Sequence, residues 1–271
     1  MEQSRALPTE VDLTRPSAAR VYDYFLGGAH NFEIDRQLAE QIAAMTPNLA
    51  DTMRAGRAFL RRAVAELSRL GVDQFLDIGS GIPTVGNVHE VAQEINPEAR
   101  IVYVDIDPVA VAHSRSILEG NARTAVIQAD MRDPEHILSE ARATGLIDFA
   151  KPVGVLLAGV VHFVPDDDDP DLLMAALRDA VPAGSFLVVS HSTYEDQPQE
   201  MLDAQKLSAR TATEITLRSK AQVTAFFGEF ELLEPGIVHM PLWRPDSADD
   251  VDDHPERFGA FGGVGRKPVA G

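Results

Sequence analysis

The sequence has no cysteine among its 271 residues. Disulfide bonds, thiolate nucleophiles and cysteine-ligated metals are therefore excluded. Basic residues are also scarce, because 24 Lys and Arg stand against 42 Asp and Glu and leave a formal net charge of -18. Proteins that bind nucleic acids need clustered Lys and Arg to displace counterions from phosphates. We therefore expect no nucleic-acid partner and favour a small or cationic substrate.

Long hydrophobic runs are missing as well. The longest uncharged apolar run, residues 152–161, is too short to span a bilayer, and residues 1–8 lack the apolar core of a signal peptide. We therefore expect a cytoplasmic protein without a membrane partner. A hydrophobic content of 45% over this length is enough for one large α/β core.

The chain divides into regions of different character. Residues 1–15 are polar and predict a flexible arm. Residues 16–70 carry apolar residues at helical spacing and predict an N-terminal helical segment, which acts as a lid or cap within the same domain as residues 71–271. Its first helix begins near Pro16 and stops before Gly27-Gly28, and further helices are expected over 31–45 and 49–70.

Short apolar runs alternate with segments of helix length after Val72. They predict β-strands over 74–78, 101–104, 125–128, 153–158 and 186–190, with helices that begin at Val85, Pro108, Pro134 and Asp171. This alternation predicts parallel strands with crossover helices on both faces of the sheet. Later segments predict helices over 199–216 and 220–227, then extended runs over 230–233, 238–243 and 258–266. The last of these runs, with no helix between them, indicate an antiparallel edge hairpin.

A glycine turn follows the first predicted strand in Gln74-Phe-Leu-Asp-Ile-Gly-Ser-Gly-Ile-Pro-Thr84. A turn of this kind can hold the pyrophosphate of a dinucleotide, but that fingerprint needs a third glycine at the position of Thr84. In addition, Pro83 removes a backbone N–H that a phosphate would use. The turn therefore fits a cofactor without phosphate better.

S-adenosylmethionine is an adenosine cofactor of this kind. Its amino acid moiety can lie along the backbone of Gly79, Ser80 and Gly81, and its ammonium can reach the carboxylate of Asp77. The alternative is a plain tight turn in an α/β protein, because glycine turns of this type also occur without a cofactor.

Acidic residues end the next two predicted strands. Asp105 can accept hydrogen bonds from both ribose hydroxyls, and Asp130 can accept the exocyclic amine of adenine. The neighbouring Ile106 and Met131 can lie against the two faces of the adenine ring. Strand-end solvation and helix capping are the alternatives for these acids, and Asp107 before a proline is most simply an N-cap.

Characteristic segments are spread along nearly the whole chain: Ala19-Arg-Val-Tyr-Asp-Tyr-Phe-Leu-Gly-Gly28, Asn31-Phe32, Gln74-Phe-Leu-Asp-Ile-Gly79, Gly86-Asn-Val-His-Glu-Val91, His162-Phe-Val-Pro-Asp166, Leu242-Trp-Arg-Pro245 and Gly262-Gly263. The turn with its two strand-end acids resembles the first three cofactor-binding motifs of class I S-adenosylmethionine-dependent methyltransferases. As a set, the segments resemble a bacterial S-adenosyl methyltransferase family that was formerly classed as a domain of unknown function.

This resemblance implies a fold and a cofactor. The fold is α/β and Rossmann-like: a sheet of seven strands, mostly parallel with an antiparallel last strand, helices on both faces and extra N-terminal helices. Residues 71–271 then form the methyltransferase domain, with S-adenosylmethionine as cofactor and S-adenosylhomocysteine as product. The exit of the fourth strand, at Ala158, borders the methyl-donating face in the resembled fold. The acceptor is not implied, because the acceptors of that family are largely undefined.

Histidines after the fourth and fifth strands are candidates for a catalytic base. Methyl transfer from a sulfonium depends mainly on holding the reactants in line, so a base is optional. His162 and His191 lie at the predicted strand ends and are of the residue type best suited to the role. The alternative for His162 is packing under the cofactor or capping a helix. We expect no metal, because these two histidines lack further matched ligands.

The first predicted helix can close over the cofactor as a lid. Its polar side carries Arg20, which can pair with the methionyl carboxylate, and Tyr22 beside it. The alternative is an amphipathic helix docked on the sheet with a glycine C-cap. The acids at 166–169 either select a cationic acceptor or form a solvated loop.

These patterns favour an S-adenosylmethionine-dependent methyltransferase that acts on an unidentified small-molecule acceptor. A nicotinamide-dependent oxidoreductase is the first alternative. It predicts a third turn glycine and a Tyr-x-x-x-Lys proton relay, whereas Tyr194 is followed four residues later by Pro198. A non-catalytic sensor that binds S-adenosylmethionine or its demethylated product is the second alternative.

Overall fold

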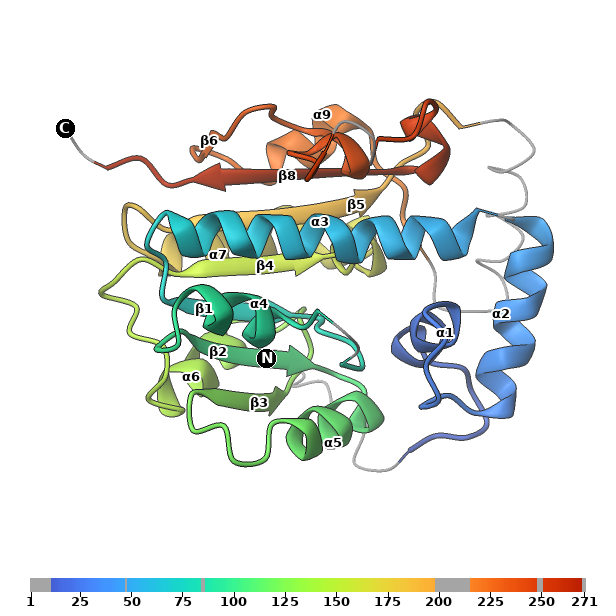
Figure 1. The fold of residues 1–271 in the computed structure, drawn as a ribbon, viewed down its shortest axis with the longest axis horizontal. Helices are drawn as coiled ribbons and strands as arrows, with labels where there is room; N and C mark the ends of the chain where they lie inside the picture. Colours follow the sequence, from blue (N-terminus) through green and yellow to red (C-terminus); the bar gives the residue numbers. More distant parts are fainter. Residues whose placement is uncertain (1–10, 47, 84–85, 198–214, 248–250, 270–271) are drawn as a thin grey trace.

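The computed structural model describes residues 11–46, 48–83, 86–197, 215–247 and 251–269. These residues form one mixed sheet of 8 strands in the order β3-β2-β1-β4-β5-β8-β6, with β7 also paired to β8 (Figure 1). The strands are β1 Gln74–Ile78, β2 Arg100–Asp105, β3 Thr124–Gln128, β4 Gly154–Ala158, β5 Phe186–Ser192, β6 Glu231–Leu232, β7 Val238–His239 and β8 Ala260–Arg266. Strands β1 to β5 run parallel, and β8 runs antiparallel to β5.

The predicted sheet, mostly parallel with an antiparallel last strand, is confirmed, but it has 8 strands instead of seven. The additional strand arises because β6 and β7, each of 2 residues, both pair antiparallel to β8. The predicted run over 238–243 stops being a strand after His239. There the chain turns into the 3-10 helix Met240–Leu242, whose Pro241 cannot donate a hydrogen bond to a sheet.

The helices are α1 Ala18–Phe25, α2 Glu33–Met45, α3 Leu49–Arg69, α4 Val88–Ile95, α5 Pro108–Ile117, α6 Pro134–Ala143, α7 Pro170–Ala180 and α9 Lys220–Ala225. Aspartate followed by proline sets the starts of α5, α6 and α7. Asp107, Asp133 and Asp169 accept hydrogen bonds from backbone N–H groups of the first turn, and proline follows each of them. The predicted starts at Pro108 and Pro134 are confirmed, and α7 begins one residue before the predicted Asp171.

Two predicted helices differ from the structure. The helix expected from Val85 begins later, at Val88, because a capping box between Asn87 and Glu90 fixes the first turn of α4. Residues 199–214 of the predicted polar helix lie outside the described residues, and the described residues that follow, 215–219, are not helical.

Helices cover both faces of the sheet. On one face α3 and α4 pack around a core that includes Phe59, Phe75 and Trp243. On the other face α6, α7 and α9 cover a core that includes Ile137 and Leu173. Figure 1 shows α3 in front of the sheet, with its axis along the strands. Among the described helices, none combines the length and the apolar character needed to cross a membrane.

Strand β8 carries glycines where helices and loops approach it closely. A Cβ on Gly262 would lie 2.9 Å from Cε2 of Phe59 in α3, and a Cβ on Gly263 would lie 2.2 Å from Cδ1 of Ile237. The same helix is fastened to the neighbouring loop, because Nε of Arg62 donates to the carbonyl oxygen of Trp243 at 2.9 Å. Helix α3 therefore lies directly on the backbone of β8.

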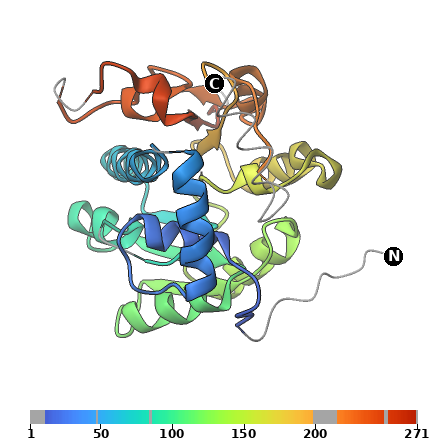
Figure 2. The ribbon, with the colours of Figure 1, turned by 90° about the vertical axis from the view of Figure 1, so that its right-hand side faces the viewer.

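Helices α1 and α2, which we call the cap, lie beyond the carboxyl ends of the parallel strands (Figures 1 and 2). They pack on each other through a cluster of their own, with Val21 and Leu38 among its buried members. The cap contacts α3 where the hydroxyl of Tyr22 donates to the carbonyl oxygen of Met53 at 2.9 Å. In open α/β sheets, ligands bind at the carboxyl edge. The cap thus covers the edge at which the predicted cofactor residues lie.

Candidate functional site

The turn after β1 contains glycines in the left-handed region. Gly79 has a φ of 72° and Gly81 a φ of 67°, which L side chains rarely adopt. A Cβ on Gly79 would lie 2.2 Å from Cγ2 of Val160, which comes from the loop after β4. Glycine is therefore required at 79, and the turn presents backbone instead of side chains at this edge of the sheet.

Ser80 is the residue between these glycines. Its Oγ is buried and has no hydrogen-bond partner among the described residues. An unpartnered buried hydroxyl costs about 1–3 kcal/mol, which a hydrogen bond to a ligand would offset. The orphaned hydroxyl is thus one observation that fits a polar ligand at this turn.

Asp105 ends β2 and reaches back to the glycine turn. Its Oδ2 accepts the backbone N–H of Gly81 at 2.7 Å, and its Oδ1 accepts that of Asp107 at 2.8 Å. Burial raises the pKa of this carboxyl to about 6, although the backbone donors lower it. Each oxygen retains a second lone pair, so the carboxylate can accept two more hydrogen bonds from a ligand.

Asp77 lies one residue before the end of β1 and is 4% exposed. Its carboxyl accepts no hydrogen bond from the part of the chain that the structure describes. Burial raises its pKa to about 7, while the guanidinium of Arg57 lowers it and the carboxylate of Asp105 raises it. A buried carboxyl that lacks donors is suited to a cationic group of a ligand, because such a group would stabilise its ionised form.

Arg57 of α3 is a site residue that the sequence did not reveal. One of its Nη atoms donates to the carbonyl oxygen of Ile82 at 3.3 Å, and the same atom lies 4.0 Å from the position that a Cβ on Gly81 would take. Its guanidinium also lies over the ring of Tyr22, 5.5 Å from the centroid. Helical spacing indicates which face of α3 is buried, but it cannot show that this arginine extends to a turn more than twenty residues later.

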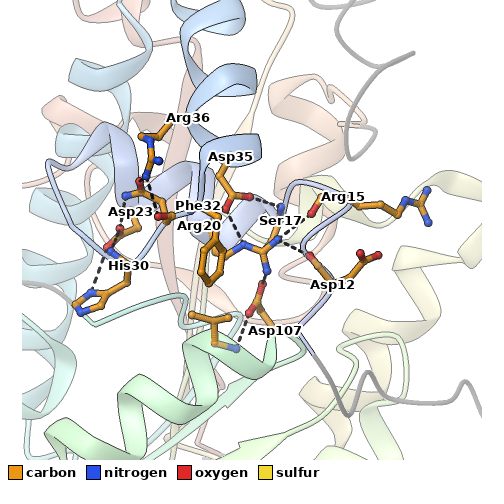
Figure 3. Close-up of polar contacts among 12 residues, drawn as sticks. Asp12, Arg15, Ser17, Arg20, Asp23, His30, Phe32, Asp35, Arg36 and Asp107 are labelled. Carbon is orange, nitrogen blue, oxygen red and sulfur yellow. Dashed lines mark hydrogen bonds and ion pairs between the residues drawn. The ribbon is translucent and has the colours of Figure 1, made fainter.

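Arg20 is not placed as predicted for pairing with the methionyl carboxylate. Its side chain is 3% exposed, and its N–H groups donate to the carboxylates of Asp35 and Asp107 and to two backbone carbonyls (Figure 3). Asp107 follows the end of β2, Asp35 lies on α2 and the two carbonyls precede α1, so none of these acceptors belongs to the glycine turn. Arg20 therefore does not provide the free cation expected for the methionyl carboxylate. Tyr22 contacts Arg57 and Met53, which both belong to α3.

Asp130 follows β3 at the same edge and is already paired. Nε of Arg132 lies 2.8 Å from its Oδ1, and the backbone N–H of Arg132 donates to the same oxygen at 3.0 Å. A ligand amine would share this carboxylate with the arginine. Ile106 is 39% exposed next to this position, whereas Met131 packs partly buried against the core. Of these two apolar side chains, Ile106 is the more accessible to a ring.

The acidic run before α7 is largely engaged by protein groups. Asp166 pairs with Arg218 at 2.6 Å, Asp168 approaches Arg132 at 3.4 Å, and Asp169 caps α7. These contacts fix the loop after β4 to neighbouring elements. They favour the structural interpretation of the run over selection of a cationic acceptor.

His162 lies in a short 3-10 helix after β4. Its ring is buried, with Nδ1 3.4 Å from Oγ of Ser192 and Cε1 3.9 Å from the position that a Cβ on Gly159 would take. Burial lowers its pKa to about 3, and the electrostatic interactions with His191 and Arg218 lower it further. The ring is therefore neutral at physiological pH and can take part in hydrogen bonds next to the exit of β4.

His191 lies inside β5 and not after it, because pairing with β8 extends β5 to Ser192. Its Nδ1 lies 2.7 Å from the carbonyl oxygen of Ser192 and so donates to it, while Nε2 accepts from Arg218 at 3.0 Å. Burial lowers its pKa to about 4. Both ring nitrogens are engaged by protein atoms, so His191 anchors Arg218 and ranks behind His162 as a candidate base.

Ala158 ends β4 in register with Ser190 of β5, so it lies at the carboxyl edge next to the glycine turn. The described residues contain no group of three or more His, Asp or Glu side chains placed to hold a metal ion. The edge therefore brings together a glycine turn, buried carboxyls and the guanidinium of Arg57. This donor set fits a ligand that has an amino acid group at one end and a nucleoside at the other.

Comparisons with known proteins identify the family and the fold. A family model described as S-adenosyl methyltransferase matches residues 4–268. A proposed methyltransferase from Thermobifida fusca YX is 40% identical, with a TM-score of 0.89 over 95% of this chain and 97% of that chain. A DUF574 family protein from Streptomyces avermitilis MA-4680 is 38% identical, with a TM-score of 0.90 over 96% of this chain and 100% of that chain. No curated protein sequence matches the chain.

A more distant structure shares the fold alone. The N-methyltransferase NodS from Bradyrhizobium japonicum WM9, in complex with S-adenosyl-L-homocysteine, is 15% identical, with a TM-score of 0.51 over 86% of this chain and 98% of that chain. The predicted class I methyltransferase fold is thereby confirmed. Since the family model covers nearly all of the sequence, the chain belongs to the S-adenosyl methyltransferase family.

Proposed function

We propose that the protein transfers the methyl group of S-adenosylmethionine to a small-molecule acceptor. The observation that carries this proposal is the meeting of Asp77, Arg57 and Asp105 around the glycine turn at the carboxyl edge of the sheet. Family membership supports it. When bound, S-adenosylmethionine supplies a methyl group on a positively charged sulfur.

The methionyl end of the cofactor is assigned to the glycine turn. Asp77 would pair with the ammonium, since its buried carboxyl gains a counter-charge there. Arg57 would bind the carboxylate in place of Arg20, because its guanidinium lies closest to Gly81 and arginine suits planar carboxylate recognition. Ser80 would donate its otherwise unpartnered hydroxyl.

The nucleoside end is assigned to the strands on the other side of the turn. Asp105 would accept hydrogen bonds from the ribose hydroxyls through the lone pairs that its backbone donors leave free. Asp130 would accept the adenine amine alongside Arg132, and Ile106 would cover one face of the ring while Met131 supports it from the core.

The acceptor is assigned to the carboxyl edge of the sheet next to Ala158 and His162. A neutral His162 can hold an acceptor by a hydrogen bond, but its lowered pKa makes it a weak proton acceptor. Transfer would then depend on positioning the nucleophile in line with the methyl group. This chemistry suits an amine in its neutral form, which attacks the methyl carbon through its own lone pair, better than a group that must first lose a proton.

Titration calorimetry with S-adenosylmethionine, S-adenosylhomocysteine and NAD tests the proposal. We expect binding of the first two ligands and none of NAD, because the turn has Pro83 where a phosphate would need an N–H donor. Binding of NAD without any response to S-adenosylmethionine would replace the proposal with a nicotinamide-dependent oxidoreductase.

A sensor that binds the same cofactor without turnover is a second candidate. Two observations favour it: both ring nitrogens of His191 are engaged by protein atoms, and the pKa of His162 is lowered. Release of S-adenosylhomocysteine in the presence of a panel of amines, phenols and carboxylic acids would identify an enzyme. Tight binding with no release over that panel supports the sensor.

A further inference from the structure

Arg20 of α1 joins segments that lie far apart in the sequence (Figure 3). Its Nε donates to Asp35 of α2 at 2.9 Å, and its Nη1 donates to Asp107, which caps α5, at 3.4 Å. Its Nη2 donates to the carbonyl oxygens of Asp12 and Arg15 at 3.2 and 2.8 Å. One guanidinium thus holds the cap, the start of α5 and the chain before α1 together.

The acceptors of Arg20 lead directly to the nucleoside site. Asp107 binds Arg20 through Oδ2, while its Oδ1 accepts the N–H of Val109 at 2.7 Å. Its own backbone N–H donates to Oδ1 of Asp105, whose Oδ2 accepts the N–H of Gly81. A continuous set of hydrogen bonds therefore runs from the chain before α1, through Arg20, to the carboxylate assigned to the ribose.

Loss of Arg20 would leave buried carboxylates without a counter-charge. Asp35 is 0% exposed and Asp107 7% exposed, so both carboxylates depend on Arg20 for their counter-charge. Asp35 also accepts the N–H groups of Ser17 and Phe32, at 3.0 and 2.9 Å. A guanidinium can serve these separate acceptors with its fork of donors, whereas the single ammonium of lysine cannot.

We propose that Arg20 is a positioning residue that couples docking of the N-terminal segment, residues 11–17, to occupation of the nucleoside half of the cofactor site. This inference rests on the proposed function, because it takes the ligand of Asp105 to be the ribose of the cofactor. A ligand that fixes Asp105 also fixes the loop from Asp105 to Asp107, and with it one acceptor of Arg20. By linkage, docking of the segment must then strengthen cofactor binding by the same factor.

Hydrogen–deuterium exchange of the full-length protein, with and without S-adenosylhomocysteine, measures this coupling. In the wild type we expect the ligand to slow exchange of the amides over residues 11–20. In Arg20→Lys that protection is lost, and calorimetry shows an affinity weaker by about tenfold, which lies within the usual range of coupling between sites. Asp107→Asn is a milder variant, because asparagine preserves the cap of α5 while it removes the charge opposite Arg20.

Arg36→Gln is the matched control. Arg36 is another arginine of the cap, on α2, but its contacts are local, with Asn31 and Glu33. We expect it to retain both the affinity and the protection. Wild-type affinity in Arg20→Lys and Asp107→Asn would overturn the inference, as would weaker binding with the protection of residues 11–20 intact. A wild-type protein that does not bind S-adenosylhomocysteine would overturn the proposed function, and this inference with it.

Discussion

Asp77 gives the sharpest test of the cofactor site, because the same carboxyl sets both ligand affinity and stability. Burial raises its pKa to about 7 in the free protein. An ammonium group can pair only with the ionised form, so a proton must leave before the pair forms. At pH 8 about nine-tenths of the molecules carry the ionised form, and at pH 6 only about one-tenth do. We therefore expect S-adenosylhomocysteine to bind about tenfold more weakly at pH 6 than at pH 8.

Stability has the opposite dependence on pH. The folded pKa of Asp77 lies above 3.8, the usual value for an aspartate, so the native state binds more protons than the unfolded chain between about pH 4 and 7. The contribution of Asp77 to stability is full below this window and is lost as the pH rises through about 7. The loss amounts to at most about 4 kcal/mol, at 1.36 kcal/mol for each unit of pKa. Asp77→Asn resembles the protonated form and removes this loss.

The assay compares the wild type with Asp77→Asn by calorimetry at pH 6 and pH 8 and by chemical denaturation at the same pH values. We expect the variant to be the more stable protein at pH 8 and to bind more weakly there, with an affinity that depends much less on pH. Asp105, with a pKa of about 6, adds at most about a factor of two to the wild-type dependence at pH 6. Equal wild-type affinity at the two pH values, or the same pH dependence in the variant, would refute the reasoning.

Other substitutions test single contacts of the site. Asp105→Ala should weaken cofactor binding by about 1.5–3 kcal/mol, since charged hydrogen bonds to the ribose are lost, and calorimetry would show an unchanged affinity if the contact lies elsewhere. Arg57→Gln should weaken binding of S-adenosylhomocysteine but not of adenosine, which lacks the carboxylate; equal losses for both ligands would contradict the assignment. Gly79→Ala should lower the free energy of unfolding by at least about 1–3 kcal/mol, because its positive φ and the contact with Val160 are both incompatible with a Cβ. If urea denaturation showed that the Gly79→Ala variant is as stable as the wild type, that packing would be excluded.

The fold follows from the sequence because β1, β2, β4 and β5 are buried on both faces. Such strands read as short apolar runs, and the predicted and observed bounds agree within two residues for β1 to β5. The predicted strand ends at residue 190, whereas β5 continues to Ser192, so His191 lies inside the strand and not after it. That extension depends on pairing between Ser192 and Ala260, a contact between distant segments that no local pattern records.

The site residues also fall into those that the sequence predicts and those that it does not. Strand-end acids such as Asp105 are predictable, because topology brings the carboxyl ends of parallel strands to one edge. Arg20 and Arg57 are not, because the reach of a long side chain depends on how the cap and α3 pack on that edge. The sequence signal for both is only an arginine on a helix, and which of them approaches the glycine turn is decided by tertiary structure.

Substitutions at the glycines of β8 can affect the cofactor site at the carboxyl edge of the sheet. Helix α3, which has 21 residues, contacts Gly262 through Phe59. Arg57 lies two residues before Phe59 on this helix. A methyl group added at Gly262 would clash with Phe59, shift α3 away from β8 and thereby displace the guanidinium of Arg57 at the glycine turn. Sequence changes in the last strand, distant along the chain from every residue assigned to the ligand, can therefore retune the site without altering any group that contacts it.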